Sequence, residues 1–113
     1  MTSESEVLML VRAASGSERA KAALTRAEQL VRAAGPGLSI FFHGPGVELA
    51  ESDARDRWLS VGRFGGARLL VCGAAWRRRF REDPDPGFEI SSLARFWSDA
   101  LQCRRFESYG QAS

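Results

Sequence analysis

The chain has 113 residues, enough for one domain with a buried core and too few for two. Its composition, 44% hydrophobic and 27% charged, is typical of a globular protein and excludes a disordered chain. The formal net charge of +2 is too small to indicate a nucleic-acid-binding protein. We therefore expect a single domain over residues 1–113, with residues 1–6 as a disordered tail.

The N-terminal part predicts a strand followed by a helix. Residues 7–11 are a continuous apolar run, as in a strand with both faces buried. Ser15 with Glu18 matches a capping box, and apolar residues then recur at helical spacing. Gly-Pro-Gly at residues 35–37 is a stop signal, so we expect the helix to end there.

The middle of the chain repeats this pattern. Residues 38–42 predict a second strand, and residues 43–46 predict a loop. From about residue 48 to residue 63 the spacing predicts one mostly exposed helix. Residues 69–71 predict a third strand that ends at Cys72-Gly73, and residues 74–80 predict a short helix.

The C-terminal part predicts two further strands. Residues 81–87 are polar and rich in proline, so we expect an exposed and mobile loop. Residues 88–90 predict a short strand, Ser91 can cap a last amphipathic helix, and residues 104–108 predict an edge strand. Strands alternating with helices predict an α/β fold, with a mainly parallel sheet covered by helices on both faces.

Three loops follow predicted strands at the edge where open α/β sheets bind ligands: residues 14–17, residues 43–46 and Cys72-Gly73. Cys72 lies where a buried strand meets a helix start, whose free N–H groups and dipole favour a thiolate. Gly73 leaves room for a partner's sulfur to approach. A buried, inert cysteine is an equally good interpretation of these residues alone.

His43, Arg78 and Arg79 are possible supporting residues. His43 could exchange protons on the same edge, or only bond a turn carbonyl. The arginines after Cys72 could dock an acidic carrier or stabilise a sulfur anion, although Arg79 is about two helical turns away. A solvated helix face is the opposing interpretation.

Other chemistry is less well supported by the sequence. Cys103 could react with sulfur carried on Cys72 and form a disulfide, but a buried or half-buried cysteine without a chemical role is favoured. Residues 15–17 match a phosphate-binding loop only weakly, which leaves a nucleotide-binding module as a minor hypothesis. Two widely spaced cysteines and a single histidine match no metal spacing, so we expect no metal or other cofactor.

Location follows from what the sequence lacks. The N-terminus has neither the basic start nor the apolar core of a signal peptide. The longest apolar stretches, such as residues 69–76, are too short to span a bilayer. We therefore expect a cytoplasmic protein without membrane contact, in which both cysteines are reduced.

Three segments resemble the DsrE/TusD family of sulfur-relay proteins, and the similarity extends over residues 7–109. They are the aromatic strand end and Gly-Val turn at residues 41–47, the strand–cysteine–Ala-Ala–Arg-Arg segment at 69–79, and the Ser-x-Leu helix start at 90–94. The cysteine segment is the most specific. Phe80 departs from a common family glycine, and His43 from a turn that is often acidic.

The resemblance implies a three-layer α/β/α sandwich with a mainly parallel five-stranded sheet. It matches Cys72 to the family's persulfide-carrying cysteine. The implied function is a sulfurtransferase that moves sulfane sulfur between small carrier proteins, in tRNA thiolation or cytoplasmic sulfur oxidation, without binding nucleic acid itself. The implied partners are subunits of the DsrE, DsrF, DsrH, TusB or TusC type, commonly in hexamers. The alternative is a non-catalytic assembly subunit of such an oligomer.

Overall fold

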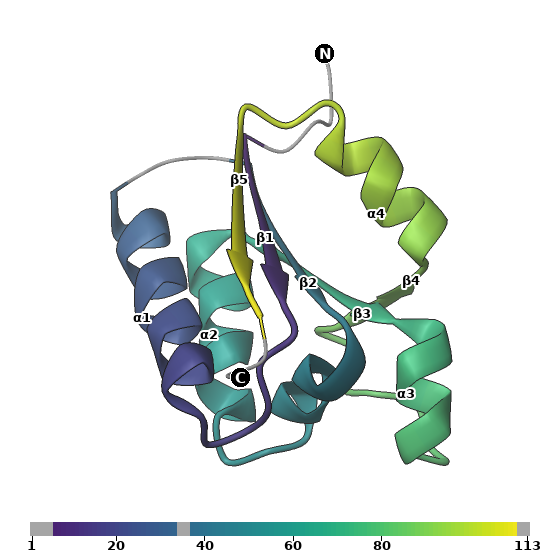
Figure 1. Cartoon of the computed structure of the whole chain (residues 1–113). Helices are drawn as coiled ribbons and strands as arrows, with labels where there is room; N and C mark the ends of the chain where they lie inside the picture. Colours follow the sequence, from purple (N-terminus) through teal and green to yellow (C-terminus); the bar gives the residue numbers. More distant parts are fainter. Residues whose placement is uncertain (1–5, 34–36, 111–113) are drawn as a thin grey trace.

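The computed structural model describes residues 6–33 and 37–110 (Figure 1). Five parallel strands form one sheet in the order β4-β3-β2-β1-β5. The five-stranded parallel sheet predicted from the sequence is therefore confirmed. The strands are β1 (Val7–Val11), β2 (Leu38–Phe42), β3 (Arg68–Cys72), β4 (Glu89–Ser91) and β5 (Arg105–Tyr109).

Helices cover both faces of this sheet. Figure 1 shows α1 and α2 on one side and α3 and α4 on the other, which completes the three layers. Within the described ranges, none of the helices combines the length and apolar character needed to cross a bilayer. The helices are α1 (Glu18–Arg32), the 3-10 helix η1 (Gly44–Ala50), α2 (Arg55–Gly65), α3 (Gly73–Arg79) and α4 (Leu93–Ala100).

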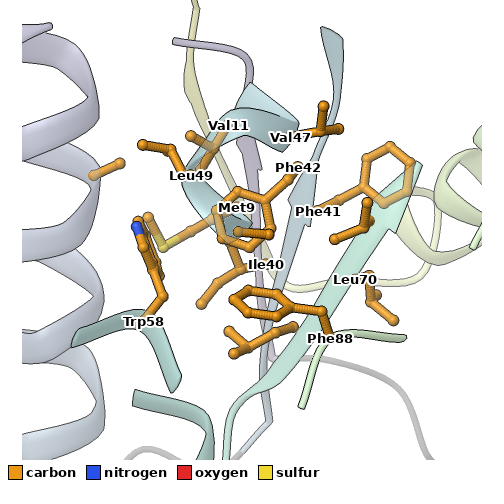
Figure 2. Packing of buried hydrophobic residues seen from close by; sticks show 14 of the residues in the cluster. Met9, Val11, Ile40, Phe41, Phe42, Val47, Leu49, Trp58, Leu70 and Phe88 are labelled. Carbon is orange, nitrogen blue, oxygen red and sulfur yellow. The ribbon is translucent and has the colours of Figure 1, made fainter. Parts of the chain in front are cut away.

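Neighbouring residues of β2 show how the strands divide the core between the two faces. The rings of Phe42 and Trp58 meet edge to face, with centroids 4.9 Å apart, on the α2 side. Phe41 instead stacks on Phe96 of α4, also at 4.9 Å. Figure 2 shows Trp58 and Phe41 on opposite sides of the central strands. Successive side chains point to opposite faces, so apolar runs are required wherever both faces are buried.

The capping residues of two helices lie one or two residues later than predicted. Ser17, and not Ser15, caps α1, because its Oγ accepts a hydrogen bond from the N–H of Ala20 at 3.1 Å. Ser92, and not Ser91, caps α4 in the same way. In both cases the capping residue is the last one in extended backbone, and only there can the side chain reach the free N–H groups.

Parts of the predicted ends fall outside the described residues. These are residues 1–5 of the expected tail, and residues 34–36, which include most of the predicted helix stop. Glu6, the last residue of the expected tail, is described. Its carbonyl oxygen accepts hydrogen bonds from the N–H groups of Arg104 and Arg105, which attaches it to the start of β5.

The single helix predicted over residues 48–63 is wrong. The chain forms η1, turns at residues 51–54, and begins α2 at Arg55. Ser52 favours the break, because its Oγ accepts a hydrogen bond from the N–H of Ala54 and competes with a continuous helix. Trp58 is fully buried, as expected for the inner stripe of the predicted helix, whereas Leu49, outside that stripe, is also buried.

The loop predicted over residues 81–87 is more anchored than expected. The indole N–H of Trp76 donates to the carbonyl oxygen of Glu82 at 2.7 Å, and Pro84 is buried. Phe88 follows and packs edge to face on Phe42, with centroids 5.9 Å apart. The loop therefore crosses the sheet edge and closes the core on the α2 side.

The polar strand β5 is attached by charge as well as by backbone pairing. Arg26 of α1 donates to both carboxylate oxygens of Glu107, with its Nη2 2.9 Å from Oε2. These hydrogen bonds hold the pKa of Glu107 below its usual value. The hydroxyl of Tyr109 donates to the same carboxylate at 3.1 Å. An edge strand needs only one apolar face, which explains the weak strand signal in its sequence.

Candidate functional site

Cys72 is the last residue of β3 and the capping residue of α3. Its register partner is Ser91 of β4, which brings the start of α4 close to it. Cys72 lies two residues after Leu70 in β3, so both side chains point to the same face of the sheet. Leu70 is the register partner of Phe41, whose ring stacks on Phe96 of α4. The cysteine side chain therefore faces the α3–α4 side of the sheet, in the gap between these two helices.

This gap is a cavity of about 580 Å³, here called the Cys72 cavity. Cys72 and Gly73 are buried at its base, and the exposed fraction of Cys72 is only 3%. Its rim is more exposed and combines polar residues with the apolar Ala74, Ile90 and Leu93. The lining residues with polar or reactive groups are Cys72, Arg77, Ser91, Ser92 and Arg95, with Gly73 beside the sulfur.

Gly73 allows a guanidinium to lie next to the cysteine. A Cβ at this position would be 3.2 Å from Nη1 of Arg77 and 2.9 Å from Cγ2 of Ile90. Both contacts are too close for a larger residue without a shift of its neighbours. Arg77 follows four positions after Gly73 in α3, so the helix itself returns its side chain over the glycine.

The cavity is positively charged. Two arginines line it, and none of its described lining residues is acidic. Within the described chain, no carboxylate lies within 4.0 Å of the Arg77 guanidinium. Arg95 has only a long ion pair with Asp99 at 3.9 Å, and its side chain is 61% exposed. The charge of both arginines therefore remains available to an anion.

His43 belongs to a different cluster. It follows β2, and its ring stacks on Phe41 with centroids 6.1 Å apart. Burial, and then the positive charges of Arg12, Arg78 and Arg79, lower the pKa of His43 below its usual value of 6.5. His43 does not line the Cys72 cavity. Arg78 and Arg79 therefore lie near His43, whereas Arg77 lines the Cys72 cavity.

The remaining strand-end loop, residues 14–17, does not line the Cys72 cavity either. Ser15 and Gly16 line a separate cavity of about 530 Å³, together with residues of α1, η1 and α2. The hydroxyl of Ser17 is already used, because it donates to the carbonyl oxygen of Ala14 at 2.7 Å and caps α1. The three strand-end loops therefore do not form one shared site.

Cys103 lies beyond the far end of α4. Its Sγ contacts the carbonyl oxygen of Ala100 at 3.4 Å, whereas Cys72 lies beside the first turn of this helix. The eight residues of α4 span roughly 12 Å at 1.5 Å per residue. A disulfide requires Cα atoms within about 7 Å. The two free cysteines could not pair without a large rearrangement.

Sequence reasoning found only part of this constellation. It treated Arg77, Arg78 and Arg79 as one group, although the four-residue spacing of Arg77 from Gly73 places these two on one face of α3. Ser92 and Arg95 gave no such signal, since only the pairing of β3 with β4 brings them to the cysteine. Among the described residues, no group of three or more histidine, cysteine or acidic side chains could hold a metal ion.

Comparisons with known proteins agree with this architecture. A sequence model of the DsrE/DsrF-like family matches residues 5–106. Among solved structures, the crystal structure of the ychN protein from E. coli is similar, with a TM-score of 0.68 and 17% sequence identity. The similarity covers 94% of this chain and 99% of that chain, and at this identity it shows the fold alone. No curated protein matches the sequence.

Proposed function

The chain belongs to the DsrE/DsrF-like family, whose role is of the sulfur-relay type, and from this premise we propose that it is a sulfurtransferase that carries sulfur as a persulfide on Cys72. The observation that carries the proposal is the position of Cys72 at the base of an open cavity that also holds Arg77. We expect this activity in the cytoplasm, where the thiol stays reduced.

Loading requires one nucleophilic substitution at sulfur. The Cys72 thiolate attacks the outer sulfur of a donor persulfide, and the donor leaves as its own thiolate. The new persulfide has an anionic terminal sulfur, which the Arg77 guanidinium over Gly73 would stabilise. In the delivery step, an acceptor thiolate attacks this terminal sulfur, and the Cys72 thiolate leaves.

The recessed position of Cys72 constrains the partner. A donor or acceptor must bring its sulfur into the cavity, so a cysteine on an extended segment of a small carrier protein fits better than one on a flat surface. Sulfur relay for tRNA thiolation and cytoplasmic sulfur oxidation both use such carriers. Neither route requires nucleic acid to contact this chain.

The second candidate is a non-catalytic assembly subunit. The low exposure of Cys72, 3%, favours it, because buried cysteines commonly act as small apolar residues. The exposed apolar residues Trp97 of α4 and Leu101, which follows the helix directly, provide a surface for contacts between subunits. The two candidates differ in whether the thiol reacts in the folded protein.

The test is sulfur loading followed by intact-mass and peptide analysis. We expect the reduced protein, incubated with a small organic persulfide, to gain one sulfur atom on Cys72. Cys103→Ser should load like the unmodified chain, and Cys72→Ser should not load at the cavity. If Cys72 gains no sulfur and its alkylation is as slow as that of a sealed thiol, the assembly-subunit function replaces this proposal.

A further inference from the structure

The Cys72 cavity holds more positive charge than a single persulfide anion needs. Arg77 reaches it from α3 and Arg95 from α4, so two guanidinium groups come from two separate elements. Ser91 and Ser92 add hydroxyl groups on the α4 side. No lining residue within the described part of the chain contributes a negative charge. Such a set of donors suits a small oxyanion.

The shape of the cavity also suits a small ligand. Cys72 and Gly73 are buried at the base, whereas Arg77 and Arg95 are exposed at the rim. A small molecule that enters meets the cations first and the sulfur second. Its volume of about 580 Å³ leaves ample room for an inorganic anion beside the cysteine.

We infer that the Cys72 cavity binds a small sulfane-sulfur oxyanion of the thiosulfate class, and that Cys72 can be loaded directly from it. This inference rests on the proposed function of Cys72 and names an additional donor for the same site. Arg77 and Arg95 bind the sulfonate group, and the outer sulfur of the ligand faces the cysteine.

The reaction needs no further reagent. The Cys72 thiolate attacks the outer sulfur of thiosulfate, and a new S–S bond forms at Sγ. The S–S bond of thiosulfate breaks, and its electron pair leaves with sulfite. A thiolate and a thiosulfate dianion give a persulfide anion and a sulfite dianion, so atoms, charge and electrons balance. The two guanidinium groups offset the repulsion between the two anionic reactants.

The experiment compares two donors on the same reduced protein. Thiosulfate and an organic persulfide without a sulfonate group are each added, and the mass gain at Cys72 is followed over time, with sulfite release measured for thiosulfate. We expect one sulfite per persulfide formed on Cys72. In Arg77→Gln and Arg95→Gln, the rate constant for thiosulfate relative to that for the organic persulfide should fall about tenfold, as expected for a lost charge-assisted hydrogen bond to the sulfonate.

Two further variants serve as controls. Arg81→Gln removes an exposed arginine outside the cavity and should leave both rate constants unchanged. Arg77→Lys should retain much of the preference for thiosulfate, which separates the role of charge from that of folding.

The possible outcomes separate the two proposals. Loading from the organic persulfide without loading from thiosulfate overturns this inference and leaves the sulfur-carrier function intact. An unchanged ratio of rate constants in both glutamine variants also overturns it. Loading from neither donor overturns both proposals.

Discussion

Cys72 and Cys103 carry the same thiol, and their surroundings differ. Cys72 lines a cavity that Arg77 also lines, whereas Cys103 contacts a carbonyl oxygen at the end of α4. Sequence alone left the role of Cys72 open between a reactive and an inert thiol. At this scale the structure adds that the Arg77 guanidinium lies close to Gly73, the residue after the cysteine, because the glycine lacks a Cβ.

His43 should make folding stability depend on pH. Burial and three nearby arginines lower its pKa in the folded protein, while the unfolded chain binds the proton near the usual 6.5. Between these two pKa values the unfolded chain holds more protons, so stability is lost as the pH falls below about 6.5. In His43→Gln, denaturant midpoints measured from about pH 7.5 to pH 5 should fall less steeply. An identical pH profile in the two proteins would contradict the assignment.

At the scale of elements, the positions of η1 and α3 determine what lies at the carboxyl ends of the strands. The N–H of His43 donates to the carbonyl oxygen of Val11, and the N–H of Gly46 donates to His43, so η1 begins directly on β1. Helix α3 begins without any loop, directly at Cys72. The absence of a linker keeps the cysteine at the sheet, between α3 and the start of α4.

Gly46→Ala tests the close packing of η1 on β1. A Cβ on Gly46 would collide with the carbonyl oxygen of Val11, a backbone atom that is already hydrogen-bonded. We expect a loss of unfolding free energy of about 1–3 kcal/mol, typical of overpacking, in denaturant titration. Gly110→Ala is the matched control, because its Cβ would meet no heavy atom within 4 Å. Equal stability of the two variants would show that η1 can move away.

At the scale of the whole molecule, α4 is apolar on two sides. Phe96 packs inward between Phe41 and Phe106, with centroid distances of 4.9 and 6.0 Å. Trp97 and Leu101 face outward and are 58% and 87% exposed. The sequence predicted an amphipathic helix, and in the structure part of its apolar face, including Leu93 at 41%, is exposed as well. Exposed apolar residues grouped in this way commonly mark an association surface.

We propose that copies of the chain associate through this outer side of α4. Sedimentation velocity should show an oligomer for the unmodified protein, and Trp97→Ser with Leu101→Ser should shift it to a smaller species. Phe64→Ser is the control, because Phe64 is 80% exposed on α2, at the opposite face of the sheet. A monomeric unmodified protein, or an equal shift with Phe64→Ser, would exclude this surface.

The sequence by itself determined the order and type of most elements. The largely apolar runs at residues 7–11 and 38–42 matched β1 and β2 in both bounds, because a strand buried on two faces carries few polar residues. Polar edges were harder to define, and β5 begins and ends one residue later than predicted. The observed helix caps also differ from the predicted ones, because a cap requires particular backbone dihedral angles that a sequence motif does not specify.

Only the tertiary structure decided which side chains share the cysteine's surroundings. His43 was expected on the same edge as Cys72, and the three arginines after the cysteine were treated as one group. In the structure His43 lies with Arg78 and Arg79, while Arg77, Ser92 and Arg95 line the cavity. Local spacing defines which face of a helix a residue occupies, and it separates Arg77 from the two arginines that follow it. Arg95 comes to Cys72 through the pairing of β3 with β4, which joins segments some twenty residues apart. Such long-range pairing depends on how the whole core packs, and no local pattern encodes it.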